Sequence, residues 1–198
     1  MTGDLSTPIT TSHKERLIYW ARLMIGRRIL SARYLSAPGS SWEEGSRVRA
    51  IHQVDMDVKI TLDDGTSAIV SWAMDGLVEG IDLKIQPKSD GLLEIDEVDV
   101  SASDEWRNLM HRVIEQVAVS WHIPNEGCPD TLWSVRLSLS KGAMVAVALG
   151  QLDDDIVQYQ PDELVVLFDE PAARAYHPPA STDSAFGTAI ELRSDATF

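Results

Sequence analysis

The segment Val58-Lys-Ile-Thr-Leu-Asp-Asp-Gly-Thr-Ser-Ala-Ile-Val-Ser-Trp72 decides the predicted fold, because it occurs a second time as Val135-Arg-Leu-Ser-Leu-Ser-Lys-Gly-Ala-Met-Val-Ala-Val-Ala-Leu149. In both copies, residues suited to strands flank a central glycine. Glycine tolerates the positive φ that a tight turn requires, so each copy predicts a β-hairpin. The spacing of the two copies indicates an internal duplication.

A helix is predicted before each hairpin. Trp20-Ala-Arg-Leu-Met24 matches Trp106-Arg-Asn-Leu-Met110, and apolar residues recur at helical spacing around both segments. In the second segment this spacing extends the predicted helix to Val117, although the alternation from Val117 to Trp121 indicates a strand taking over near Glu115.

These patterns predict an α+β fold with two tandem copies of a helix plus a small antiparallel sheet. Each sheet is bent or small-barrel-like, and the two could pair into one continuous sheet. A helix followed by bent strands resembles the element order of Sm-like or SH3-like small barrels, an order that implies no function. The predicted organisation is a flexible N-terminus (1–11), a first unit (12–86), an acidic connector (87–103), a second unit (104–177) and a flexible tail (178–198).

Charge is unevenly distributed along the chain. The net charge is −14, yet residues 14–49 carry eight Lys or Arg and only three acidic residues. Overall acidity argues against binding to nucleic acid or to an anionic membrane, because such binding needs concentrated positive charge. The acidity favours a basic protein partner, and the arginines of 14–49 are expected to pair within the chain or with a second copy.

The remaining composition is that of an ordinary globular protein. A single cysteine, Cys128, excludes an intrachain disulfide and is typical of a reducing compartment, so a cytoplasmic location is expected. No Gly-x-Ser-x-Gly segment and no phosphate-binding glycine loop occurs in the sequence. Non-catalytic function is therefore favoured, without excluding an enzyme.

Metal and cofactor sites are not predicted. His111, His122, Glu126 and Cys128 are the right residue types for zinc, but their spacing matches no zinc-binding pattern. The acidic runs, including Asp153-Asp-Asp155, lack the spacing of a calcium-binding loop.

Two groups of residues are candidates for binding. The first is Trp42 with Asp153, Asp154 and Asp155, where an aromatic anchor and carboxylates would recognise a basic partner. The function predicted from it is a non-catalytic acidic binding module, such as an inhibitor, an immunity-like protein or a regulatory adaptor.

The second group is His111, Trp121 and His122. They would line a small-molecule or enzyme site in a cleft between the two units, since ligand pockets often form at such places. A structural homo-oligomer, in which the basic face of 14–49 meets the acidic face of a neighbour, is a third possibility.

Overall fold

The computed structural model consists mainly of β-strands. It describes residues 11–36, 42, 47–48, 50–75, 78–87, 96–154, 156–179 and 181–190. In chain order the elements are α1 (Thr11–Leu23), β1 (Ile29–Ser36), β2 (Arg47–Val48), β3 (Ile51–Val54), β4 (Asp57–Leu62), β5 (Thr66–Asp75), β6 (Val78–Pro87), β7 (Asp96–Asp99), α2 (Asp104–Arg107), β8 (Ile114–His122), β9 (Thr131–Leu139), the 3₁₀ turn η2 (Ser140–Gly142), β10 (Ala143–Leu149), β11 (Gln151–Asp153), β12 (Ile156–Gln158), β13 (Leu164–Leu167), α3 (Glu170–Ala175) and β14 (Thr188–Ala189).

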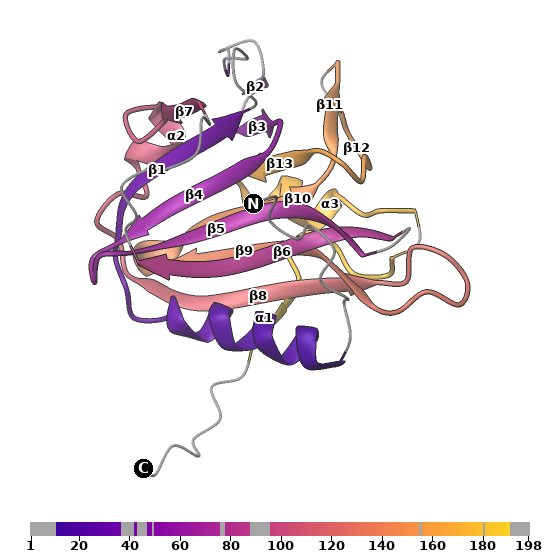
Figure 1. Ribbon diagram of the computed structural model, residues 1–198. Coiled ribbons are helices and arrows are strands. Elements are labelled where there is room, and N and C mark those ends of the chain that lie inside the picture. Colours follow the sequence, from indigo (N-terminus) through magenta and orange to yellow (C-terminus); the bar gives the residue numbers. More distant parts are fainter. Residues whose placement is uncertain are drawn as a thin grey trace, which may run out of the picture.

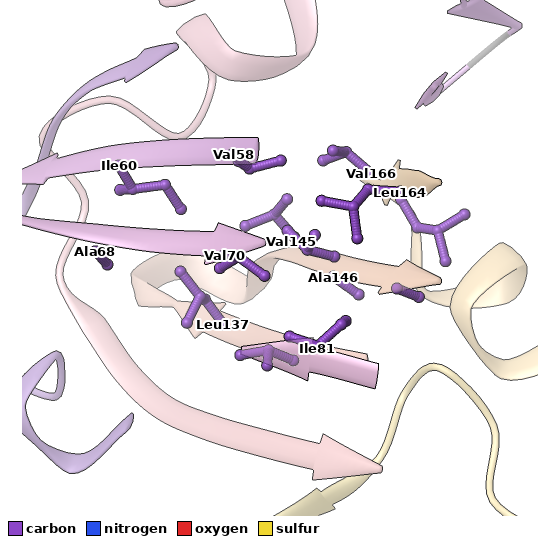
Figure 2. Packing of buried hydrophobic residues seen from close by; sticks show 14 of the residues in the cluster. Val58, Ile60, Ala68, Val70, Ile81, Leu137, Val145, Ala146, Leu164 and Val166 are labelled. Carbon is purple, nitrogen blue, oxygen red and sulfur yellow. The ribbon is translucent and has the colours of Figure 1, made fainter. Parts of the chain in front are cut away.

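Two antiparallel sheets pack against each other (Figure 1). The strand order is β6-β5-β4-β1-β7 in the first sheet and β14-β8-β9-β10-β13-β3-β2 in the second, while β11 and β12 form a separate two-stranded ribbon. Figure 2 shows the layer between the sheets, where Val58 and Val70 from the first sheet face Leu137 and Val145 from the second. Both sheets therefore share one hydrophobic core.

The predicted α+β fold of two tandem helix-plus-sheet units is wrong. Among the described residues only α1 is a helix of appreciable length, and β2 and β3 from the predicted first unit belong to the second sheet. β3 belongs to the N-terminal half of the chain but pairs with β13, with Val54 opposite Leu164. Exposed Asp55 lies in the two-residue connection where the chain passes from one sheet to the other. The N-terminal and C-terminal halves of the chain therefore bury their apolar side chains together and do not form separate units.

Both hairpins predicted from the repeated segment are confirmed. β4 pairs with β5 and β9 pairs with β10, and Gly65 and Gly142 have φ of 82° and 72° in the two turns. Arg28 and Val113 form an isolated antiparallel bridge just before β1 and β8. This bridge joins the beginnings of β1 and β8.

The predicted strand near Glu115 is confirmed, because β8 begins at Ile114, but the helix predicted before it is much shorter than expected. α2 ends at Arg107, and His111 adopts φ of 61°, a left-handed conformation that no helix continues through. Val117 and Val119 then pair with β9, where their branched side chains are buried. Strand pairing in the core outweighs the helical spacing of the apolar residues.

Part of the segment expected to form a flexible tail packs on the second sheet. The Oγ atoms of Ser120 and Ser134 donate to the carbonyl oxygens of Ser184 and Ala185 at 2.7 and 2.8 Å. Thr188 then pairs with Val119 as strand β14. The described residues 181–190 thus cover one side of β8 and β9.

Candidate functional site

The β11–β12 ribbon carries the predicted aspartates. Figure 1 shows the ribbon standing out from the two sheets, and we call residues 151–158 the arm. Asp153 and Asp154 are exposed at its tip, and the side chain of Ile156 is 66% exposed. Asp154 has φ of 53°, a turn conformation that Asp tolerates better than most residues. Asp155, the third predicted aspartate, lies outside the described residues.

The foot of the arm is anchored by Gln53 from β3. The Leu152 N–H donates to Gln53 Oε1 at 2.9 Å, and the Gln53 side-chain amide donates to Glu163. The pKa of Glu163 is raised, first by partial burial and then by the carboxylates of Asp162 and Asp55. These groups place negative charge around the foot of the arm.

Trp42 lies beside the same anchor. Its Nε1–H donates to the backbone oxygen of Gln53 at 2.8 Å, and its half-buried ring packs on Tyr34 and His52, with centroid separations of 5.2 Å to each. No packing partner for Trp42 was predicted from the sequence, whereas the structure provides two. Gln53 therefore connects Trp42 with the arm that carries Asp153 and Asp154.

Behind Trp42 a buried hydrogen-bond network links β1, β3 and α2. Trp106 Nε1–H donates to Tyr34 Oη at 2.8 Å, Tyr34 Oη lies 2.7 Å from His52 Nδ1, and His52 Nε2 lies 3.3 Å from Glu105 Oε2. The rings of Trp42 and Phe168 pack on His52. We call Tyr34, His52, Glu105 and Trp106 the partnered network.

We assign the tautomer of His52 from the partners of Tyr34. Tyr34 Oη accepts the Trp106 N–H, and its own proton finds an acceptor in His52 Nδ1. In this assignment His52 carries its proton on Nε2 and donates it to Glu105. Burial raises the pKa of Tyr34 well above its ordinary value, so its hydroxyl stays protonated. The exposed fraction of His52 is 0%, which makes the network a structural tie between the sheets and α2.

The second predicted group is divided by the fold. His111 is exposed in the turn after α2, where its backbone N–H donates to the Ile29 oxygen at 2.7 Å. Trp121 is half-buried on β8, with Lys14 Nζ 4.4 Å from its ring centroid. Only His122 enters a buried cluster, packing on Tyr159 and Trp133 with centroid separations of 5.6 and 6.2 Å.

We call His122, Trp133, Tyr159 and Tyr176 the unpartnered cluster. Neither ring nitrogen of His122 has a hydrogen-bond partner, nor does Nε1 of Trp133, among the residues described. Burial lowers the pKa of His122 to about 4 and raises that of Tyr159 to about 12. All four side chains are therefore uncharged at neutral pH. The sequence singled out His122 but carried no signal for Trp133 or Tyr159, which the fold alone brings to it.

Two arginines of the basic segment form ion pairs within the chain. Arg27 pairs with Asp64 at 3.2 Å, and Arg33 lies 2.7 Å from Glu97 and 4.0 Å from Asp99. The expectation that these arginines pair within the chain is confirmed at both positions.

Comparison of the chain with protein-family models, with curated proteins and with solved structures finds no match. Within the described ranges, no three His, Cys, Asp or Glu side chains gather as metal ligands. No helix there is long and apolar enough to cross a membrane. The local chemistry of the arm and the two clusters therefore carries the functional argument.

Proposed function

We propose that the protein is a non-catalytic binding module that recognises a basic protein partner through the arm and the adjoining Trp42 region. The observation that carries this proposal is the projecting arm, with Asp153, Asp154 and the apolar Ile156 exposed together at its tip. Carboxylates around an exposed aliphatic side chain give a partner both charge and apolar surface to bury.

The charges of the arm are available to a partner. Among the described residues, no Lys or Arg forms an ion pair with Asp153 or Asp154, and the Gln158 amide donates to Asp153 at 2.5 Å. Asp162 and Glu163 add negative charge at the foot. A basic partner would meet this field before contact, which raises the association rate.

The arm is also held in place before binding. Gln53 bonds its first strand, and Val157 on its second strand packs against the core. Two hydrogen-bonded strands with a fixed foot lose less conformational entropy on binding than an unstructured loop. The affinity for the basic partner should therefore depend mainly on the exposed side chains of Asp153, Asp154 and Ile156.

The test is an affinity capture from the native cell extract with the wild-type chain, followed by kinetics with the captured basic protein. Asp153→Lys/Asp154→Lys should lower the association rate at least tenfold at low salt, and Ile156→Ala should raise the dissociation rate. Glu115→Lys/Asp104→Lys makes the same change in net charge at exposed positions on β8 and α2, and serves as the control.

The control should bind within about twofold of the wild type. Equal losses in the arm variant and the control would show that net charge alone drives binding, and would contradict the proposal. Capture of the chain's own copies would instead support the homo-oligomer.

A further inference from the structure

The unpartnered cluster contains three buried polar atoms without a hydrogen-bond partner in the described structure. They are Nδ1 and Nε2 of His122 and Nε1 of Trp133, on side chains of residues that are 4% and 0% exposed. Buried donors and acceptors are nearly always bonded in folded proteins, because an unbonded one costs about 1–3 kcal/mol. Three such atoms on two neighbouring rings point to a molecule that bonds them.

A β-bulge brings these atoms together. Ser120 lies opposite Ser134 and Trp121 lies opposite Leu132, so Trp133 is an extra residue on β9. A bulge reorients the side chain at its position and is frequent beside binding sites. His122 follows directly on β8, and its ring faces the indole of Trp133 at a centroid separation of 6.2 Å.

Two tyrosines complete the cluster. Tyr176 packs edge-on to Trp133 at 5.7 Å and donates its hydroxyl to the Leu149 oxygen. It fits closely against Gly150, where a Cβ atom would lie 2.6 Å from Tyr176 Oη. Tyr159, at the foot of the arm, is half-buried and gives the cluster its contact with solvent.

The charge of the surroundings limits what could bind. Burial lowers the pKa of His122, and burial together with the Glu79 carboxylate raises the pKa of Tyr159. An anionic ligand would therefore lose its hydration without gaining a counter-ion, because the only nearby charge among the described residues that acts on these side chains is itself negative. The neutral imidazole offers one donor and one acceptor, and the indole offers one donor.

We propose that His122, Trp133 and Tyr159 form a binding site for a small, uncharged, planar molecule that carries both a hydrogen-bond acceptor and a donor, as an aromatic carboxamide does. Its carbonyl oxygen accepts from Trp133 Nε1–H or the imidazole N–H, and its amide N–H donates to the free imidazole nitrogen. The aromatic side chains contact its ring. This site is distinct from the arm surface.

The test uses benzamide as the probe, with benzoate and toluene as matched compounds. Benzoate adds a charge and toluene removes the polar group. Binding is followed by calorimetry and by the indole N–H signals of the six tryptophans in NMR spectra, with Trp133→Phe identifying the signal of Trp133. Benzamide should shift that signal and bind at least tenfold more tightly than either matched compound.

His122→Leu removes both imidazole nitrogens and should weaken benzamide binding at least tenfold. It should also fold, because it replaces an unbonded polar group by an apolar one. His177→Leu, at an exposed histidine beside Tyr176, is the control and should bind as the wild type does. Asp153→Lys/Asp154→Lys should also retain benzamide binding, which separates this site from the proposed partner surface.

Three outcomes would overturn the inference. The first is the absence of any change in the Trp133 signal at millimolar benzamide in a protein shown to be folded, which would mean that ordered water alone satisfies the three buried atoms. The second is equal binding of benzamide, benzoate and toluene, which would mean that the polar group of the ligand is not recognised. The third is equal binding by wild type and His122→Leu, which would mean that the imidazole does not contact the ligand.

Discussion

The two buried histidines of this protein have opposite surroundings. His52 lies in a network where Tyr34 and Glu105 occupy its two nitrogens, and the indole N–H of Trp106 fixes the direction of the hydrogen bonds. His122 is also buried, with 4% of its surface exposed against 0% for His52, yet neither of its nitrogens is bonded in the described structure, and the nearby indole N–H of Trp133 is unbonded too. Burial alone therefore does not tell a structural histidine from a candidate binding residue.

The difference has an energetic meaning. In the partnered network, hydrogen bonds between side chains replace the hydrogen bonds that these groups make to water in the unfolded chain. Removing one side chain therefore leaves another buried group unbonded. His122 and the indole N–H of Trp133 lose their hydration without such compensation. The first cluster should stabilise the fold, whereas the second should reduce stability until a molecule bonds it.

The same substitution at the two histidines should give the largest contrast. His52→Leu should lower the free energy of unfolding by about 4 kcal/mol, because Tyr34 Oη and Glu105 both lose a buried partner. His122→Leu should leave it unchanged or raise it by up to about 1 kcal/mol. Urea denaturation followed by circular dichroism measures both, and equal losses would remove the distinction drawn between the clusters.

Acid should destabilise the protein through His122. Its pKa is about 4 in the folded state, below the ordinary 6.5, so between these values the unfolded chain binds the extra proton. Stability should fall as the pH drops from about 6.5 towards 4, by up to about 3 kcal/mol from this residue.

The comparison of wild type with His122→Leu over this pH range isolates the contribution of His122. The titrating carboxylates are common to both proteins, including those of Asp57 and Glu163, whose pKa values are raised. Parallel stability curves for the two proteins would show that His122 is not held neutral by burial.

A tryptophan pair tests the same contrast without changing charge. Trp106→Phe removes the donor to Tyr34 Oη and should cost about 2 kcal/mol in unfolding free energy. Trp133→Phe removes an indole N–H that has no partner in the described structure, so it should cost about 1 kcal/mol less.

Trp106→Phe has a second readout in ¹⁵N NMR of histidine. In the wild type, the Nδ1 signal of His52 should be that of an unprotonated nitrogen, whereas the variant should show exchange between the two neutral forms. A wild-type Nδ1 that already carries the proton would contradict the proposed direction of the network.

Glu105→Gln should have the smallest effect, about 1 kcal/mol or less. In this variant the side-chain amide oxygen would still accept the His52 Nε2–H, and only the charge assistance of the hydrogen bond would be lost. Thermal unfolding by calorimetry detects such a difference. A loss as large as that of His52→Leu would indicate that His52 is charged.

The two hairpins of this fold follow from local sequence, but the assembly of the sheets does not. Asp64-Gly65 and Lys141-Gly142 predicted two hairpins, and both formed because glycine permits the turn and apolar residues flank it. The predicted tandem arrangement is wrong because the chain passes from one sheet to the other at Asp55. Apolar and polar residues alternate without a break across this point, so the sequence does not mark the change of sheet. Alternation records which residues are buried, not which sheet buries them.

The candidate sites show the same limit. His122 stood out by residue type, and the arm aspartates stood out as a charge run. Trp133 and Tyr159 reach His122 only through a bulge and through the return of the arm, both of which depend on pairing between distant strands. Gln53, which connects Trp42 with the arm, has no distinguishing sequence signal.

The position of β3 has a consequence for synthesis on the ribosome. Val54 pairs with Leu164, so most of the chain must be translated before β13, which pairs with one edge of β3, exists. Until then the N-terminal half exposes a strand edge that could pair with other nascent chains. We therefore expect slow, late completion of the second sheet, and a dependence of soluble yield on chaperones that bind the emerging N-terminal half.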